Sequence, residues 1–148
     1  MRHILIYIIF PVLLTFVSCG TEPEPINYGH DQCYFCKMSI VDENYGAEVV
    51  TSKGKVYKFD AAECMINYLN ENNLTDDEAG KLLVIDTSEP GKLIDAVKAY
   101  YLISPKLKSP MGENISAFES MDKASEYKKE YGGDFYDWEI LKRNLKDK

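Results

Sequence analysis

An internal repeat is the feature that most narrows the folds open to this chain of 148 residues. The stretch VYKFDAAECMINY (56–68) can be laid over ISAFESMDKASEY (115–127) at a shift of 59 residues. The matched positions are Phe59 with Phe118, Asp60 with Glu119 and Tyr68 with Tyr127. Each stretch passes from a β-branched and aromatic segment into a helical pattern. The repeat therefore predicts that the two halves share one order of elements.

The first half is expected to contain two strands, a helix and a third strand. Asp60 is a candidate N-cap, and Glu63 is its capping-box partner three residues later. Four apolar residues at helical spacing form the predicted core stripe of this helix: Ala62, Met65, Ile66 and Leu69. The expected elements are strands within 39–50 and 54–60, a helix from Asp60 to about Asn72 and a strand at 82–86.

The second half repeats this order. Ser120 is the candidate N-cap of the second helix, and Gly132 and Gly133 are its expected stop. The expected elements are strands at 98–104 and 115–119, a helix from Ser120 to about Tyr131 and a last strand at 134–140. The sequence therefore predicts an α+β protein of two similar ββαβ units packed together, one at 31–88 and one at 89–148.

The N-terminal segment has the pattern of a lipoprotein signal peptide. A basic start precedes the uncharged apolar run from Ile4 to Val17, which is shorter than the about 20 apolar residues of a membrane-spanning helix. The run ends in FVSCG, so we expect residues 1–18 to be removed and Cys19 to carry the lipid. An ordinary signal peptide with an incidental cysteine is the alternative. Residues 19–30 are Pro-rich and polar, which favours a flexible tether that places the domain beside a membrane.

Charge and cysteine content limit the possible functions. The chain has 17 basic and 24 acidic residues, and removal of residues 1–18 would leave a formal charge of −8. This acidity argues against a nucleic-acid partner, because such partners need basic surfaces. If Cys19 is lipidated, the three remaining thiols are Cys33, Cys36 and Cys64. Since an odd number cannot all pair within one chain, at least one is free or binds a ligand.

The stretch HDQCYFCKM (30–38) holds the candidate metal ligands. A Cys-x-x-Cys pair alone is weakly specific, because disulfides, zinc sites and redox dithiols all use it. Met38 lies two residues beyond Cys36, so its thioether is expected on the same side if the chain is extended there. A further thioether, Met111, lies in the turn SPMGE, where a methionine has little core to fill. Thiolate and thioether are soft donors that favour Cu(I).

Other interpretations of the same residues remain open. A four-ligand zinc site from Cys33, Cys36, Cys64 and His30 fits the preference of zinc for thiolate and imidazole. A thioredoxin-like dithiol is disfavoured, because its Cys-x-x-Cys would precede a helix and here it precedes a predicted strand. A Cys33–Cys36 disulfide that pins the start of the domain is the simplest structural alternative.

Helical geometry separates the roles of neighbouring residues. At 100° per residue, Met65 lies within the apolar stripe of the first helix, whereas Cys64 points to the side of Tyr68. Met65 is therefore expected in the core, and Cys64 faces either a second packed layer or a site. Met121, at the start of the second helix, is also expected in the core. His30 is a possible ligand, although a histidine at the end of a tether is more often solvated.

The sequence resembles the NosL family, the nitrous oxide reductase accessory lipoproteins of denitrification. The resemblance rests on an ordered set of motifs that covers residues 31–141: CYFCKM, FDAAECM, LIDAVKAYYLIS, PMG with AFES after it, and GG, together with the lipobox-like Cys19.

The resemblance implies a fold of two ββαβ units and a function. The family function is that of a periplasmic, membrane-tethered Cu(I) chaperone that supplies nitrous oxide reductase, with the NosDFY transporter as partner. Carried over by motif, the expected Cu(I) ligands are Cys36 and Met38, from C-x-M, and Met111, from PMG. Cys33, Cys64 and His30 are further candidates.

We therefore expect a copper carrier on the periplasmic side of a bacterial membrane. The sequence shows no Ser-His-Asp set, paired carboxylates or phosphate loop, and this pattern predicts that the protein is not an enzyme. Two alternatives are a periplasmic thiol–disulfide oxidoreductase that uses Cys33 and Cys36, and a structural module stabilised by zinc.

Overall fold

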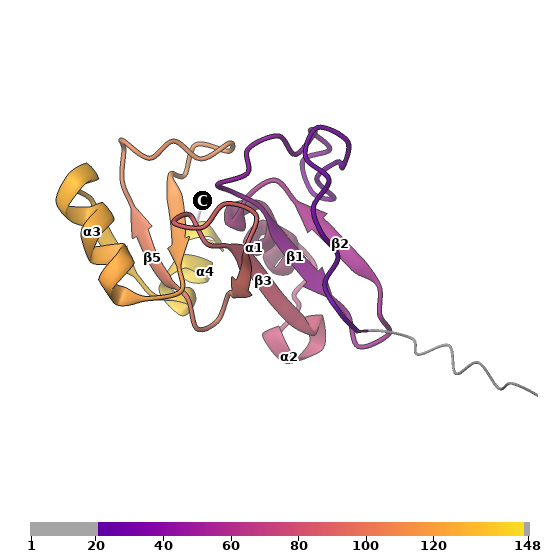
Figure 1. The fold of residues 1–148 in the computed structure, drawn as a ribbon. Coiled ribbons are helices and arrows are strands. Elements are labelled where there is room, and N and C mark those ends of the chain that lie inside the picture. The colour runs from indigo at the N-terminus through magenta and orange to yellow at the C-terminus, as the bar shows by residue number, and fades with distance from the viewer. Residues whose placement is uncertain (1–20, 147–148) are drawn as a thin grey trace, which may run out of the picture.

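The computed structural model describes residues 21–146 as two α+β halves that lie side by side (Figure 1). The predicted signal peptide, residues 1–18, and the predicted lipidation site, Cys19, lie outside the described residues. No helix within 21–146 is long and apolar enough to cross a bilayer.

The first half is an antiparallel sheet with one long helix. Its elements are β1 (Ala47–Val50), β2 (Val56–Phe59), α1 (Ala62–Glu71), α2 (Asp76–Ala79), β3 (Lys81–Ile85) and β4 (Leu93–Asp95). The strand order is β2-β1-β3-β4, so the first strand of the unit is central and the helix connects the two strands beside it. The core stripe predicted for α1 is confirmed, since all four of its residues are buried.

The second half has the same arrangement. Its elements are β5 (Tyr100–Ile103), β6 (Ile115–Phe118), α3 (Met121–Tyr131), β7 (Asp134–Tyr136) and α4 (Trp138–Lys146). The strand order β6-β5-β7 again places the first strand in the centre. The strands β2 and β6, and the helices α1 and α3, begin at the 59-residue spacing of the sequence repeat. The prediction of an α+β fold with two ββαβ units is confirmed.

Local details differ from the prediction at both helix starts. Asp60 does not cap α1: the N-cap position is Ala61, which makes no side-chain cap, and Asp60 is buried before it. Ser120 does cap α3 by accepting a hydrogen bond from the N–H of Lys123. The expectation that Met121 lies in the core is wrong, because it is exposed and Ala124 is the buried residue of α3.

The C-terminal helix α4 was not predicted from the sequence. The stretch 134–140 was expected to be one strand, but the strand ends at Tyr136 and Trp138 opens a helix. The side chain of Asp137 accepts a hydrogen bond of 2.8 Å from the N–H of Ile140, as an N-cap residue does. Helix α4 packs against α1 of the first half, and its buried residues Trp138 and Leu141 join the main core.

A second connection between the halves follows β3. The N–H of Thr87 donates to the carbonyl of Ala117 on β6 at 2.8 Å, and the N–H of Ala117 donates to the Thr87 hydroxyl at 3.2 Å. The two sheets are therefore joined by one main-chain hydrogen bond and one hydrogen bond to a side chain, as well as through the core.

Part of the predicted tether packs on the first half. Ile26 belongs to the buried core, and the N–H of Glu24 donates to the Glu48 carboxylate at 3.2 Å. Lys58 of β2 donates to the carbonyl of Pro25 and to the carboxylate of Asp31, both at 2.8 Å. The tether was predicted to end at residue 30, but its second half lies against the sheet because Ile26 finds an apolar site there.

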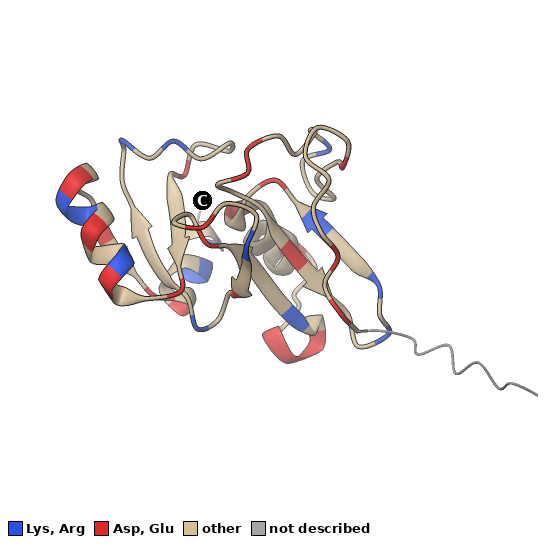
Figure 2. Ribbon diagram, in the orientation of Figure 1, with Lys and Arg blue, Asp and Glu red and all other residues tan. Residues whose placement is uncertain are grey.

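Charged residues of both signs are interspersed along the chain of both halves (Figure 2). Lysine and arginine occur on strands, helices and turns, and acidic residues lie among them. Neither half is therefore distinguished by residues of a single charge sign.

Candidate metal site

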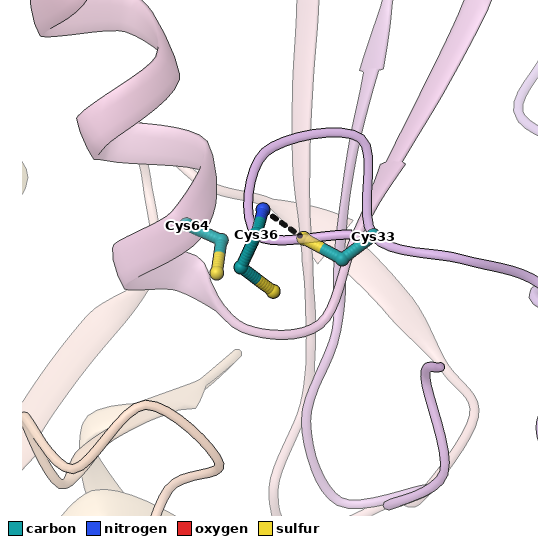
Figure 3. Close-up of side chains that lie close together, drawn as sticks. All are labelled: Cys33, Cys36 and Cys64. Atoms are coloured by element: carbon teal, nitrogen blue, oxygen red, sulfur yellow. Dashed lines mark hydrogen bonds between the residues drawn. The ribbon is translucent and has the colours of Figure 1, made fainter. Parts of the chain in front are cut away.

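Three thiols meet in the first half (Figure 3). The sulfur atoms of Cys33, Cys36 and Cys64 all lie within 4.8 Å of one another. Cys33 and Cys64 are fully buried, whereas Cys36 is partly exposed. All three are free cysteines in this structure. We call this group the three-thiol cluster.

A tight loop positions the first two cysteines. Gln32 and Ser39 pair as an antiparallel bridge, and between them the N–H of Cys33 donates to the carbonyl of Met38 at 2.8 Å. The N–H of Lys37 donates back to the carbonyl of Cys33 at 3.0 Å. Lys37 has a left-handed backbone, with φ of 66°, so the chain reverses within this segment. The extended conformation assumed for Met38 and Cys36 is therefore absent from this segment.

Helix α1 supplies the third thiol. Met65 is buried in the core, as predicted. Cys64, one position earlier in the first turn, faces the loop that carries Cys33 and Cys36 (Figure 3). The helical wheel indicated that Cys64 leaves the apolar stripe, and in the structure it faces the sulfur atoms of Cys33 and Cys36.

The three thiols of the cluster differ in the direction in which their pKa values are shifted. A hydrogen bond with the Cys64 thiol lowers the pKa of Cys33 to about 5; burial opposes this, and the N–H groups of Asp60 and Cys36 add to it. The N–H of Cys36 lies 3.5 Å from the Cys33 sulfur. The hydrogen bond with Cys33 raises the pKa of Cys64, and burial raises the pKa of Cys36. Within the cluster, the thiolate form is therefore favoured at Cys33 and the protonated form at Cys36 and Cys64.

The predicted thioether ligands lie on the surface. Met38 is 49% exposed, and its N–H hydrogen-bonds the sulfur of Cys36. Met111 is 37% exposed in a turn in which the N–H of Gly112 donates to the carbonyl of Ser109 at 3.1 Å. This turn is joined to α1, because the Ser109 hydroxyl donates to the carboxylate of Glu63, the residue before Cys64.

His30 is exposed, and it is outside the group of side chains whose ligand atoms lie within 4.8 Å of one another. The four-ligand zinc site that was considered therefore finds three of its four members together. Of the described residues, the grouped metal-binding side chains at this site are the three cysteines.

Aromatic side chains border the loop of Cys33 and Cys36, and no motif in the sequence had marked them as neighbours of the three-thiol cluster. The ring of Tyr34 lies 4.5 Å from that of Tyr57 and 5.6 Å from that of Tyr68, centroid to centroid. The Lys37 ammonium lies 4.4 Å from the centroid of Tyr34 and donates to its carbonyl. Cys64 and Tyr68 are four residues apart on α1 and therefore lie on the same face of the helix. This spacing could have predicted an aromatic ring beside the cysteine.

The cluster suits a soft metal ion of low coordination number. Three sulfur donors arise from two segments, and the pKa of one of them, Cys33, is lowered. Cu(I) accepts such a set, whereas structural zinc sites close with a fourth ligand.

Comparisons with known proteins agree on one family. The sequence model described as NosL matches residues 26–145. The "Copper-binding lipoprotein NosL" of Stutzerimonas stutzeri is 31% identical over 140 residues, which cover 82% of this chain and 72% of that protein. The crystal structure of the copper chaperone NosL from Shewanella denitrificans superposes with a TM-score of 0.67 and 21% identity, covering 81% of this chain and 95% of that one. The last match supports the fold.

Proposed function

The chain belongs to the NosL family, and from this premise we propose that it is a copper chaperone that carries Cu(I) rather than an enzyme. The observation that carries the proposal is the three-thiol cluster, in which soft donors from two segments lie within 4.8 Å. The name of the Stutzerimonas relative, a copper-binding lipoprotein, supports the same cargo.

The buried and exposed donors have different roles in this proposal. Cys33 and Cys64 hold the ion away from solvent, and Cys36 completes the set at the surface. Binding displaces the thiol protons of Cys36 and Cys64, since the thiolate is the form that ligates metals. The exposed thioethers of Met38 and Met111 complete the coordination of the bound ion, and they are the donors that exchange during uptake and delivery. His30 is a further candidate for such exchange.

The destination of the copper is the finer part of the proposal. We propose that the protein is held by a lipid on Cys19 at the periplasmic side of a bacterial membrane. It delivers Cu(I) for assembly of the copper centres of nitrous oxide reductase, together with the NosDFY transporter. The family resemblance and the lipoprotein relative support this role.

Anaerobic titration against a Cu(I) competitor tests the ligand set. We expect one Cu(I) per chain, and we expect Cys36→Ser and Met111→Ala to weaken binding. If both variants hold Cu(I) as tightly as the parent protein, the assignment of these ligands is wrong. Elemental analysis after reconstitution with equal Cu(I) and Zn(II) distinguishes a copper carrier from a zinc module, because the latter would retain zinc.

An oxidoreductase function is favoured by one observation and opposed by another. The low pKa of Cys33 is typical of a redox thiolate. However, Cys33 is fully buried, and the accessible thiol, Cys36, has a raised pKa. A disulfide substrate would therefore meet the less reactive sulfur. A dithiol potential in the catalytic range, independent of Met38 and Met111, would support this alternative.

A further inference from the structure

We propose that Glu63 and Ser109 form a clamp that positions the Met111 turn against helix α1, and that Glu63 is thereby a positioning residue for copper binding. The inference rests on the proposed function, and it concerns residues that are not themselves ligands.

The clamp is a hydrogen bond between the two halves of the molecule. The Ser109 hydroxyl donates to Oε1 of Glu63 and accepts from the N–H of Asn114 at 2.8 Å. Both residues are buried: Glu63 is completely inaccessible, and Ser109 is 7% exposed. The Ser109 hydroxyl therefore fixes both ends of the segment 109–114 to one carboxyl group on α1.

The segment between these contacts presents the methionine. Gly112 has a φ of 87°, which a glycine adopts without strain, and its N–H closes a turn on the Ser109 carbonyl. Met111 is the third residue of this turn, and its side chain is partly exposed. Its neighbours are thus held while its own side chain is free to approach an ion.

Glu63 is an unusual residue for a buried position in the first turn of a core helix. Burying a carboxyl group is unfavourable unless hydrogen bonds satisfy it. Burial raises the pKa of Glu63, while hydrogen bonds from the Ser109 hydroxyl and the N–H groups of Glu63 and Glu113 act in the opposite direction. The residues on both sides of Met111 in the turn region therefore interact with this one side chain.

The position of Glu63 connects the clamp to the thiols. Glu63 directly precedes Cys64, so the turn is attached to the same helical turn that supplies the third thiol. Met111 belongs to the second half, whereas the three thiols belong to the first. Without the clamp, the turn must be ordered when the ion binds, and this ordering lowers affinity.

The test compares serine variants of the same loop. Ser109→Ala removes the clamp. Ser104→Ala is the matched control, because Ser104 is a buried serine at the start of this loop whose hydroxyl donates to the carbonyl of Tyr131 at 2.8 Å instead. Met111→Ala serves as reference, and Ser109→Thr keeps the hydroxyl. Each protein is titrated anaerobically with Cu(I) against a competitor, and its sulfur coordination is measured by X-ray absorption.

We expect Ser109→Ala to weaken Cu(I) binding by about tenfold, as the loss of a partner behind a ligand does. The same variant should lose one sulfur from the coordination shell. Ser104→Ala should bind as the parent does, and Ser109→Thr should restore affinity. The double variant Ser109→Ala with Met111→Ala should bind no more weakly than Met111→Ala alone.

Two results would overturn the inference in different ways. If Met111→Ala binds normally, Met111 is not a ligand, and that part of the proposed function fails together with the clamp. If Met111→Ala weakens binding but Ser109→Ala keeps parent affinity and sulfur count, the ligand assignment stands and the clamp is wrong. Thermal denaturation of all variants separates a loss of fold from a loss of positioning, because Ser104→Ala and Ser109→Ala should lower stability to a similar degree.

Discussion

The two halves share strand order and helix position but differ in what lies beside the helix. The aromatic pair Phe59–Tyr68 of the first half, with ring centroids 5.4 Å apart, has its counterpart in Phe118–Tyr127, at 4.7 Å. The repeat therefore builds the same helix-on-sheet packing twice.

The three-thiol cluster, in contrast, lies in the first half alone. The position of Cys64 on α1 corresponds to Lys123 on α3, which is exposed and pairs with Glu126 at 3.0 Å. The loop of Cys33 and Cys36 precedes β1 and covers the start of α1. The comparison shows that the repeated unit provides the scaffold and that the segment before β1 adds two of the three grouped thiols to one copy.

Truncation of the matched phenylalanines tests the shared scaffold and should have the largest effect. Phe59 and Phe118 are both fully buried, so we expect Phe59→Ala and Phe118→Ala each to lower the free energy of unfolding by about 3 kcal/mol. Urea denaturation measures this. Only Phe59→Ala should also weaken Cu(I) binding. Equal copper affinities of the two variants would show that the site does not depend on the packing beneath it.

Substitution at the matched helix positions tests the difference between the halves. We expect Cys64→Ala to weaken Cu(I) binding by about 100-fold or more, because the loss of a ligand should cost at least the upper end of the 10–100-fold effect of losing an outer partner. Lys123→Ala should leave binding unchanged because its side chain is in solvent. Anaerobic competition titration of both variants provides the measurement, and parent-like affinity of Cys64→Ala would remove α1 from the site.

The central strands supply a pH-dependent contrast. Glu48 on β1 corresponds in register to Tyr101 on β5, and burial raises the pKa of Glu48 to about 7. Because protonation favours the folded state, the stability contributed by Glu48 is complete below its unfolded pKa of 4.5 and is lost as pH rises through 7.

Raising the pH from 4.5 to 8 should therefore destabilise the parent protein but not Glu48→Gln through this group. The free energy of unfolding of Glu48→Gln, relative to that of the parent, should rise by on the order of 2 kcal/mol over this range. Thermal denaturation of both proteins from pH 4.5 to 8 measures this change. Parallel curves for the two proteins would show that Glu48 does not titrate in this range.

The helix caps provide the smallest contrast. Ser120 caps α3, whereas Ala61 at the matched position makes no side-chain cap on α1. Ser120→Ala should lower the free energy of unfolding by about 1 kcal/mol. Ser125→Ala, within α3, is the control and should not destabilise the protein, because alanine has the higher helix propensity. Equal effects of the two changes would argue against the cap.

The sequence predicted the elements that local patterns define. The Ser120 cap and the apolar stripe with Met65 each depend on residues close in the chain. The repeat compares two such local patterns. The structure confirms all three. Helix α4 was missed because the aromatic residues of 134–138 resemble a strand, although Asp137 was an available N-cap signal. The predicted cap by Asp60 is absent, because α1 begins one residue later, after Ala61. The N–H of Asp60 hydrogen-bonds the sulfur of Cys33.

The site itself depends on contacts that one sequence does not reveal. The helical wheel turned Cys64 away from the core, but nothing local brought it to Cys33 and Cys36. The shared side of Cys36 and Met38 was expected on the condition that the chain is extended there, and this condition is not met because Lys37 adopts a left-handed backbone that glycine usually occupies. The link between Ser109 and Glu63 crosses 46 positions and both halves.

The origin of the thiols in two separate segments of the chain affects how long the folded protein survives. An ion held by Cys33 and Cys64 closes a chain loop that the unfolded state leaves open. A ligand that binds only the folded state stabilises it by mass action, by about 2.7 kcal/mol when its concentration is one hundred times the dissociation constant. A loaded carrier therefore resists heat and proteases better than an empty one. The persistence of the protein in the cell would then follow the supply of its cargo.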